Sequence, residues 1–149
     1  MMDGCDQAGI SADLSDLAYF GVTVPCVQSL SPVSLAYIGD AVFELYVRMH
    51  LLWPPQRIQQ FHQQVVSRVK AEQQASYLAQ LLPHLNDAEA DVVRRGRNGS
   101  SKAPKRLSTK IYRQATAFET LIGYLYITNQ ERLWQLLKEL RVSATPEFS

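Results

Sequence analysis

Hydrophobic side chains recur every three or four residues along most of this chain, which is the spacing of amphipathic helices. The pattern begins at Ser31-Pro32, where Ser can act as an N-cap and Pro fits the first helical turn. The apolar positions that follow are Leu35, Ile38, Val42, Leu45, Met49 and Leu52. Other apolar residues widen this stripe almost around the helix, so we expect a central helix, buried on most sides, that ends at Pro54-Pro55.

The segment after the two prolines predicts further helices. One helix starts near Gln56, breaks near Ser67 and then resumes. Asn86 and Glu89 have the spacing of a capping box, in which each side chain bonds to the backbone N–H of the other residue. They therefore open a short helix that runs to about Arg97.

Residues 98–105 are rich in Gly, Ser and Pro, which predicts a loop. Ser108 can cap the next helix, and a last helix is centred on residues 133–140. No segment shows the alternating pattern of a strand, so the predicted fold class is all-α. The predicted organisation is an extension at residues 1–30 with a short helical turn near residues 14–20, a helical domain at residues 31–141, and a tail at residues 142–149.

Length and composition agree with a soluble domain. A chain of 149 residues fits one domain that buries its own core, and no apolar run reaches the roughly 18 residues that a membrane span needs. The first basic residue is Arg48, so the N-terminal segment fits neither a secretory signal nor a transit peptide. We therefore expect a cytoplasmic location, with Cys5 and Cys26 as free thiols.

The net charge of +1 conceals an uneven distribution of charge. The stretch between Val92 and Phe118 contains no carboxylate and 8 of the 15 basic residues, namely Arg94, Arg95, Arg97, Lys102, Lys105, Arg106, Lys110 and Arg113. Such a local field attracts a polyanion. The stretch therefore indicates binding of a polyanion, and a solvated helix end and loop is the alternative.

Two carboxylates lie in apolar surroundings, Asp40 near the middle of the first long helix and Glu119 in the helix after Ser108. An unpaired buried carboxylate costs several kcal/mol or takes up a proton, so such residues usually have a partner. Glu44 follows Asp40 by one helical turn and adds like charge. A metal ion between Asp40 and Glu119 would relieve this repulsion. The alternative is that each acid pairs with a basic side chain or a backbone donor.

Gly39 and Gly123 adjoin these acids in helix interiors, where Gly costs roughly 0.5–1 kcal/mol relative to Ala. They indicate a close approach of the backbone at both places. Ordinary packing between helices is the alternative explanation.

The segments 35–45 and 117–126 resemble the signature helix and the second acidic motif of the ribonuclease III catalytic domain. The similarity is most specific to the Mini-ribonuclease III branch, which has no double-stranded-RNA-binding domain. Tyr37, the segment 95–98 and Tyr112-Arg113 also fit that branch, and the resemblance extends from about residue 31 to residue 140. It implies a helical bundle like the ribonuclease III endonuclease domain, with residues 31–141 as the catalytic domain.

The sequence departs from the larger ribonuclease III enzymes at two positions. Ala36 and Thr116 stand where those enzymes have carboxylates, although similar losses are typical of the Mini-ribonuclease III branch. The departures leave an alternative open, a catalytically silent ribonuclease III-like module that binds RNA in association with ribosomes.

The resemblance implies a Mg²⁺-dependent endoribonuclease that cleaves double-stranded RNA into products with 5′-phosphate ends. It suggests maturation of precursor large-subunit ribosomal RNA, Mn²⁺ as a substitute ion, a homodimer, and a ribosomal protein as a further partner. The implied metal ligands and catalytic residues are Asp40 and Glu119, with Glu44, Tyr37 and Thr116 as candidates for supporting them. The candidate RNA contacts are Arg94, Arg95, Arg97, Lys102, Lys105 and Arg106. The candidate dimer contacts are Gly39, Phe43, Tyr46 and Val47.

Overall fold

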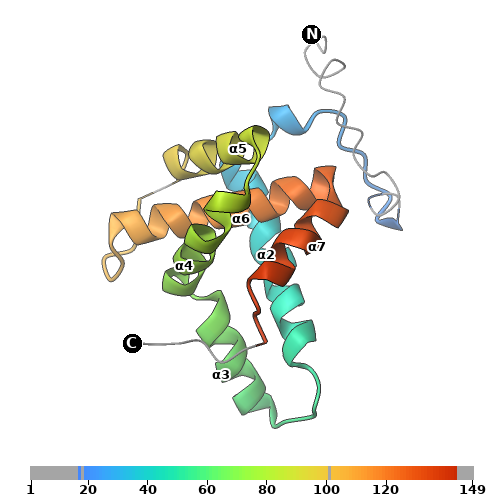
Figure 1. The fold of residues 1–149 in the computed structure, drawn as a ribbon, viewed down its shortest axis with the longest axis vertical. Helices are drawn as coiled ribbons and strands as arrows, with labels where there is room; N and C mark the ends of the chain where they lie inside the picture. The colour runs from blue at the N-terminus through green and yellow to red at the C-terminus, as the bar shows by residue number, and fades with distance from the viewer. Residues whose placement is uncertain (1–16, 18, 101, 144–149) are drawn as a thin grey trace.

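A computed structural model describes residues 17, 19–100 and 102–143, and these residues form helices and connecting segments without any strand (Figure 1). The elements in chain order are η1 (Val27–Ser29), α2 (Pro32–Leu51), α3 (Ile58–Val69), α4 (Ala71–Leu81), η2 (Leu82–His84), α5 (Asp87–Asn98), α6 (Thr109–Thr128) and α7 (Gln130–Glu139). The predicted all-α class is confirmed. Within the described residues, no helix has the combination of length and hydropathy that a membrane crossing requires.

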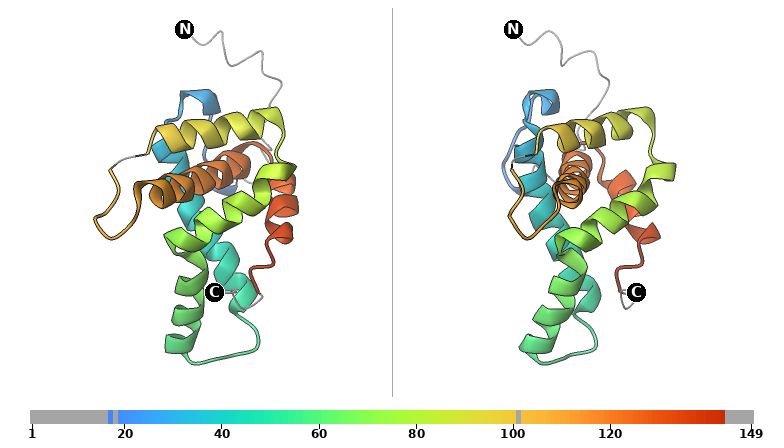
Figure 2. Two further views of the ribbon diagram at one scale, coloured as in Figure 1. Left: turned by 60° about the vertical axis from the view of Figure 1, so that its left-hand side comes forward. Right: turned by 90° about the vertical axis from the view of Figure 1, so that its left-hand side faces the viewer.

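Helix α6 is the centre of the molecule and packs against α2, α4, α5 and α7 (Figures 1 and 2). Its side chains Phe118, Leu121 and Ile122 are completely buried. The Phe43 ring of α2 meets the Phe118 ring edge to face, with the ring centroids 4.9 Å apart. Losing a buried aromatic ring from such a core costs about 3–5 kcal/mol.

The prediction of a helix at 31–53 that is buried on most sides is wrong in part. Helix α2 buries only one face against α6, and much of its remaining apolar surface is exposed. The exposed large side chains of α2 are Val33, Tyr37, Ile38, Leu45 and Met49. An apolar stripe that is too wide for one core indicates that part of it packs in the protomer and part against another surface. The stripe alone does not tell which part faces the protomer's own core.

The helix boundaries follow the predicted caps. The Ser31 side chain accepts a hydrogen bond from the Ser34 backbone N–H, and Ser108 caps α6 in the same way. The capping box of Asn86 and Glu89 is present, with backbone-to-side-chain distances of 3.0 and 2.8 Å. The break between α3 and α4 lies at Lys70, where the backbone is extended, three residues beyond the predicted position.

The backbones of α2 and α6 touch where the two helices cross. A Cβ atom added to Gly39 would lie 1.8 Å from the carbonyl oxygen of Glu119, and one added to Gly123 would lie 1.9 Å from the carbonyl oxygen of Leu35. The close approach that both glycines indicated is therefore confirmed. It fixes Asp40, the neighbour of Gly39, at the level of Glu119.

Parts of the N-terminal predictions lie outside the described residues. The helical turn near residues 14–20 is described only at Leu17 and Tyr19, which are both helical. Cys26 is disulfide-bonded, so the prediction of a free thiol is wrong there, and Cys5 lies outside the described residues. The division into residues 1–30, 31–141 and 142–149 stays a prediction.

Candidate active site

Asp40 and Glu119 come from different helices and lie close enough to repel each other. Burial, together with the negative charge of Asp40, raises the pKa of Glu119 to about 8. Asp40 is exposed on α2, unlike the buried acid that its apolar neighbours suggested, and partial burial together with the charge of Glu44 raises its pKa. The crossing at Gly39 thus brings together two acids that are far apart in the sequence.

Neither acid forms an ion pair with a basic residue in the described part of the chain. The salt bridges there belong to other carboxylates, including Glu44, which lies 3.4 Å from the Arg48 guanidinium, and Glu89, which pairs with Arg132. Among the described residues, therefore, neither Asp40 nor Glu119 has the basic partner that the alternative hypothesis required. Glu44 instead pairs with Arg48 on the exposed side of α2, and its role at the site stays a prediction.

Glu119 has one neutral partner that the sequence analysis missed. The Gln74 side chain on α4 is 2% exposed and hydrogen-bonds to the Glu119 carboxylate. A signal was present in the sequence, because Gln74 stands one turn before Tyr77 and Leu78 on the face of α4 that packs into the core. A polar residue at a core position usually has a specific partner.

The two carboxylates offer oxygen ligands, which are the ligands that Mg²⁺ prefers. No group of three or more His, Cys, Asp or Glu side chains that could hold a metal is found among the described residues, so a site here rests on Asp40 and Glu119. Mg²⁺ often uses only one or two carboxylates and keeps several waters or phosphate oxygens. Burial is the main cause of the raised pKa of Glu119 and the negative charge of Asp40 adds to it, so a cation between the two carboxylates would favour the ionised form of Glu119.

The remaining candidates around the acids have other environments. Tyr37 is 80% exposed, and no hydrogen bond joins it to either carboxylate within the described residues. The Thr116 carbonyl accepts a hydrogen bond of 2.7 Å from the Thr120 hydroxyl, which is buried between α6 and the start of α2. A direct supporting role for Tyr37 or Thr116 stays a prediction.

Three of the four predicted dimer contacts lie in the protomer's own core. Phe43 and Val47 have no exposed surface, and Gly39 is enclosed in the helix crossing, so these residues are used by the protomer's own core. The fourth candidate, Tyr46, is half-buried and stacks on Trp134, with ring centroids 5.9 Å apart. The apolar stripe of the sequence contains both the core face and the exposed face of α2, and residue spacing alone does not distinguish them.

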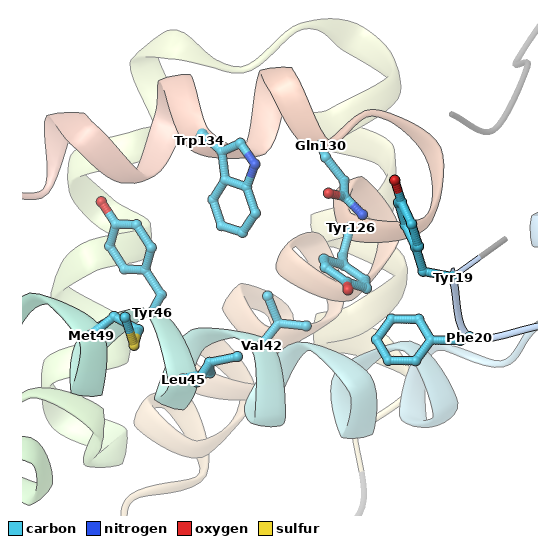
Figure 3. Close-up of a pocket in the computed structure, with 9 residues that line it drawn as sticks. All are labelled: Tyr19, Phe20, Val42, Leu45, Tyr46, Met49, Tyr126, Gln130 and Trp134. Carbon is cyan, nitrogen blue, oxygen red and sulfur yellow. The ribbon is translucent and has the colours of Figure 1, made fainter. Parts of the chain in front are cut away.

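A pocket of about 460 Å³ opens beside the exposed face of α2 (Figure 3). Its lining is mainly aromatic and aliphatic and consists of Tyr19, Phe20, Val42, Leu45, Tyr46, Met49, Tyr126, Gln130 and Trp134. Figure 3 shows the Gln130 amide among these rings. The Gln130 Nε2 group is buried and has no hydrogen-bond partner among the described residues, so the pocket contains an unused donor.

The basic residues gather where α5 ends and α6 begins. These two helix ends lie on the same side of the molecule in Figures 1 and 2, and the intervening segment carries Lys102, Lys105 and Arg106, which are all exposed. Arg94 is paired with Asp91, one turn earlier in α5, and the Arg97 Nε–H donates to Gln114 at 3.0 Å. The exposed charges of the loop are therefore freer to meet a polyanion than the charge of Arg94.

The metal-free protein should lose stability as the pH rises, because Glu119 titrates near 4.5 when unfolded and near 8 when folded. Between these values the folded state binds more protons than the unfolded state, so the free energy of unfolding falls with rising pH. The Glu119→Gln variant should lack this loss. In thermal unfolding with a chelator, it should exceed the wild type at pH 8 by about 2–4 °C for each 1 kcal/mol relieved, and match it near pH 4. The exposed Glu139→Gln serves as the control, and parallel pH profiles for all three proteins would contradict the assignment.

The chain is similar to known proteins over this same region. Residues 33–130 match the family model described as the ribonuclease III domain. A Mini-ribonuclease 3 of Synechocystis sp. is 56% identical over 113 residues, covering 76% of this chain and 79% of that protein. A Mini-ribonuclease 3 of Gloeobacter violaceus is 49% identical, covering 74% and 82% of the two chains. The crystal structure of a protein from Fusobacterium nucleatum matches with a TM-score of 0.70 and 26% identity, covering 75% of this chain and 93% of that one. The chain therefore belongs to the ribonuclease III domain family, in its Mini-ribonuclease III branch.

Proposed function

We propose that this endoribonuclease cleaves double-stranded RNA with Mg²⁺ bound by Asp40 and Glu119, and that it acts in maturation of precursor large-subunit ribosomal RNA. One observation supports the catalytic part most strongly. Two carboxylates from α2 and α6 converge at a glycine crossing without a basic partner among the described residues. The names of the Mini-ribonuclease 3 relatives support the same activity.

The chain's own residues prepare the reaction. Asp40 and Glu119 would hold the cation, and Glu119 keeps a proton near neutral pH until the cation replaces it. When bound, Mg²⁺ supplies Lewis-acid chemistry that activates water and offsets the charge developing on the phosphate. The expected products carry 5′-phosphate and 3′-hydroxyl ends, as in the family, and Mn²⁺ should substitute because it accepts the same oxygen ligands.

The basic surface at the α5–α6 connection would hold the RNA. Duplex RNA is recognised mainly through its shape, its phosphates and its 2′-hydroxyl groups, so an exposed basic segment is suited to it. Lys102, Lys105 and Arg106 are the exposed candidates, and the half-buried Arg95 and Arg97 lie at the adjoining end of α5. Arg94 would have to exchange Asp91 for a phosphate.

The proposal includes a homodimer that pairs the exposed face of α2 and the adjoining pocket with the same surface of a second copy. Ile38, Leu45 and Met49 are 41%, 61% and 60% exposed, an unusual amount of apolar surface for one side of one helix. A two-fold dimer would bury this surface on both copies, and the second copy would offer a hydrogen-bond acceptor to the Gln130 amide. Two sites would then face one RNA duplex.

The wider context of the proposal is a cytoplasmic enzyme that meets precursor ribosomal RNA, with a ribosomal protein as a further partner. A catalytically silent RNA-binding module is the second candidate, because Ala36 and Thr116 replace carboxylates of the larger enzymes. Incubation of duplex RNA with the protein and Mg²⁺ separates the two, since the silent module would bind the strands and leave them whole. Competition by duplex DNA as strong as that by duplex RNA would favour a DNA-binding protein instead.

The Asp40→Asn variant should fold and bind duplex RNA but lose cleavage, because an amide is a poor ligand for a divalent cation. We expect the rate to fall by more than the roughly 10–100-fold that removing an outer-shell partner of a metal costs. Cleavage of a labelled duplex and a binding assay in Ca²⁺ measure the two effects. Asp87→Asn makes the same change at an exposed carboxylate and should cleave normally, and substantial activity of Asp40→Asn would count against a metal at this position.

Replacing Arg95 or Lys105 by Ala should weaken binding to all duplex sequences alike. Each lost phosphate contact should reduce the slope of log affinity against log salt by about 1. Lys138→Ala removes the same charge from α7 and should leave the slope unchanged. A slope that is unaltered in the Arg95 and Lys105 variants would remove the α5–α6 connection from the RNA surface.

Leu45→Glu should convert the dimer into a monomer, because it places a charge in the centre of the exposed face of α2. Light scattering coupled to size exclusion measures the mass of each species. Ile58→Glu makes the same kind of change at a side chain of α3 that is 77% exposed, and this variant should remain dimeric. A monomeric wild-type protein, or a dimeric Leu45→Glu variant, would refute this surface as the interface.

A further inference from the structure

The buried face of α4 contains one polar side chain that its packing does not require. The buried residues of this helix are Gln74, Tyr77, Leu78 and Leu81. Gln74 is 2% exposed, and burying an amide without hydrogen bonds is unfavourable. An apolar residue at this position would avoid that cost. The hydrogen bond from Gln74 to the Glu119 carboxylate therefore has a use other than filling the core.

Glu89 is a second buried carboxylate, and its partner Arg132 has a structural role. Glu89 is also 2% exposed, and the Arg132 guanidinium holds both of its oxygens, with two N–O distances of 2.9 Å. Although burial acts to raise the pKa of Glu89, the hydrogen bonds from Arg132 and the Asn86 backbone lower it. Glu89 is thereby neutralised by a fixed cation and serves the junction of α5 with α7.

Glu119 differs from Glu89 in the charge of its partner. An Arg at position 74 would cancel the charge of Glu119 and repel any cation that approached Asp40. A neutral amide can fix the direction of the carboxylate without cancelling its charge. The Gln–Glu pair is therefore compatible with a bound cation, whereas the Arg–Glu pair is complete without one.

We propose that Gln74 is a positioning residue of the active site, whose side-chain amide donates to Glu119 and holds that carboxylate in the orientation in which it shares a divalent cation with Asp40. This inference rests on the proposed metal site of Asp40 and Glu119. Gln74 does not touch the substrate in this proposal. It acts through Glu119, from a third helix, so that α2, α4 and α6 each contribute one residue to the site.

The test is the binding of Mn²⁺ to the full-length protein without RNA, measured by electron paramagnetic resonance. Gln74→Met keeps the size of the side chain and removes the donor, so the core should remain packed. We expect the Kd for Mn²⁺ to rise about 10–100-fold, the usual effect of losing an outer-shell partner. The Mg²⁺ concentration for half-maximal cleavage should rise in parallel, while duplex RNA binding in Ca²⁺ stays at the wild-type level.

Gln80→Met is the matched control, because Gln80 is an exposed glutamine on the same helix. It should bind Mn²⁺ as the wild type does. Thermal unfolding of each variant in chelator shows whether the fold is kept. If Gln74→Met lowers only the melting temperature and leaves the Mn²⁺ Kd unchanged, Gln74 is a structural residue and the proposal is overturned.

Asp40→Asn separates the failure of this inference from the failure of the proposed function. If Asp40→Asn loses Mn²⁺ binding and Gln74→Met retains it, the metal site stands and the role of Gln74 falls. If Asp40→Asn binds Mn²⁺ as tightly as the wild type, the metal site is refuted and this inference falls with it. Loss of Mn²⁺ binding in both variants, with Gln80→Met unaffected, is the result that we expect.

Discussion

The backbones of α2 and α6 meet at Gly39 and Gly123 with no room for a Cβ atom on either helix. This contact sets the distance and the angle between the two helices, because any side chain at these positions would push the backbones apart. It also sets the level at which Asp40 stands beside Glu119. The rest of the fold then packs around α6, with α4 and α5 on either side of it and the Phe43–Phe118 contact at the core (Figure 2). The candidate site is thus a consequence of this close helix crossing.

The two carboxylates at this crossing repel each other when both are ionised. The pKa of Glu119 rises to about 8, which means that the metal-free fold is less stable when this group ionises. Glu89 shows that the same protein can relieve a buried carboxylate completely with an arginine. At Glu119 it has a glutamine instead, and the unrelieved charge is available to a cation. Stability and function therefore make opposite demands on Glu119.

Helix α2 has two apolar faces with different uses. One face, with Phe43 and Val47, enters the core, and the other, with Leu45 and Met49, borders the pocket of Figure 3. The basic surface at the α5–α6 connection lies at the opposite end of α6 from Tyr126 and that pocket. A protomer built in this way can hold its catalytic acids, a surface for RNA and a surface for a second copy on separate parts of a small bundle.

The helices and the chemical class of the site could be predicted from the sequence. Side-chain spacing, Ser31, Asn86 and Ser108 set the helices, because periodicity and caps are local properties. Asp40, Glu119 and the two glycines were conspicuous, since acids and glycines are unfavourable inside apolar helices. Three facts required the folded structure: which side of α2 is core, that the two acids meet, and that Gln74 of α4 bonds to Glu119. Those facts depend on how separate helices cross, and the spacing of residues along one helix contains no information about its neighbours.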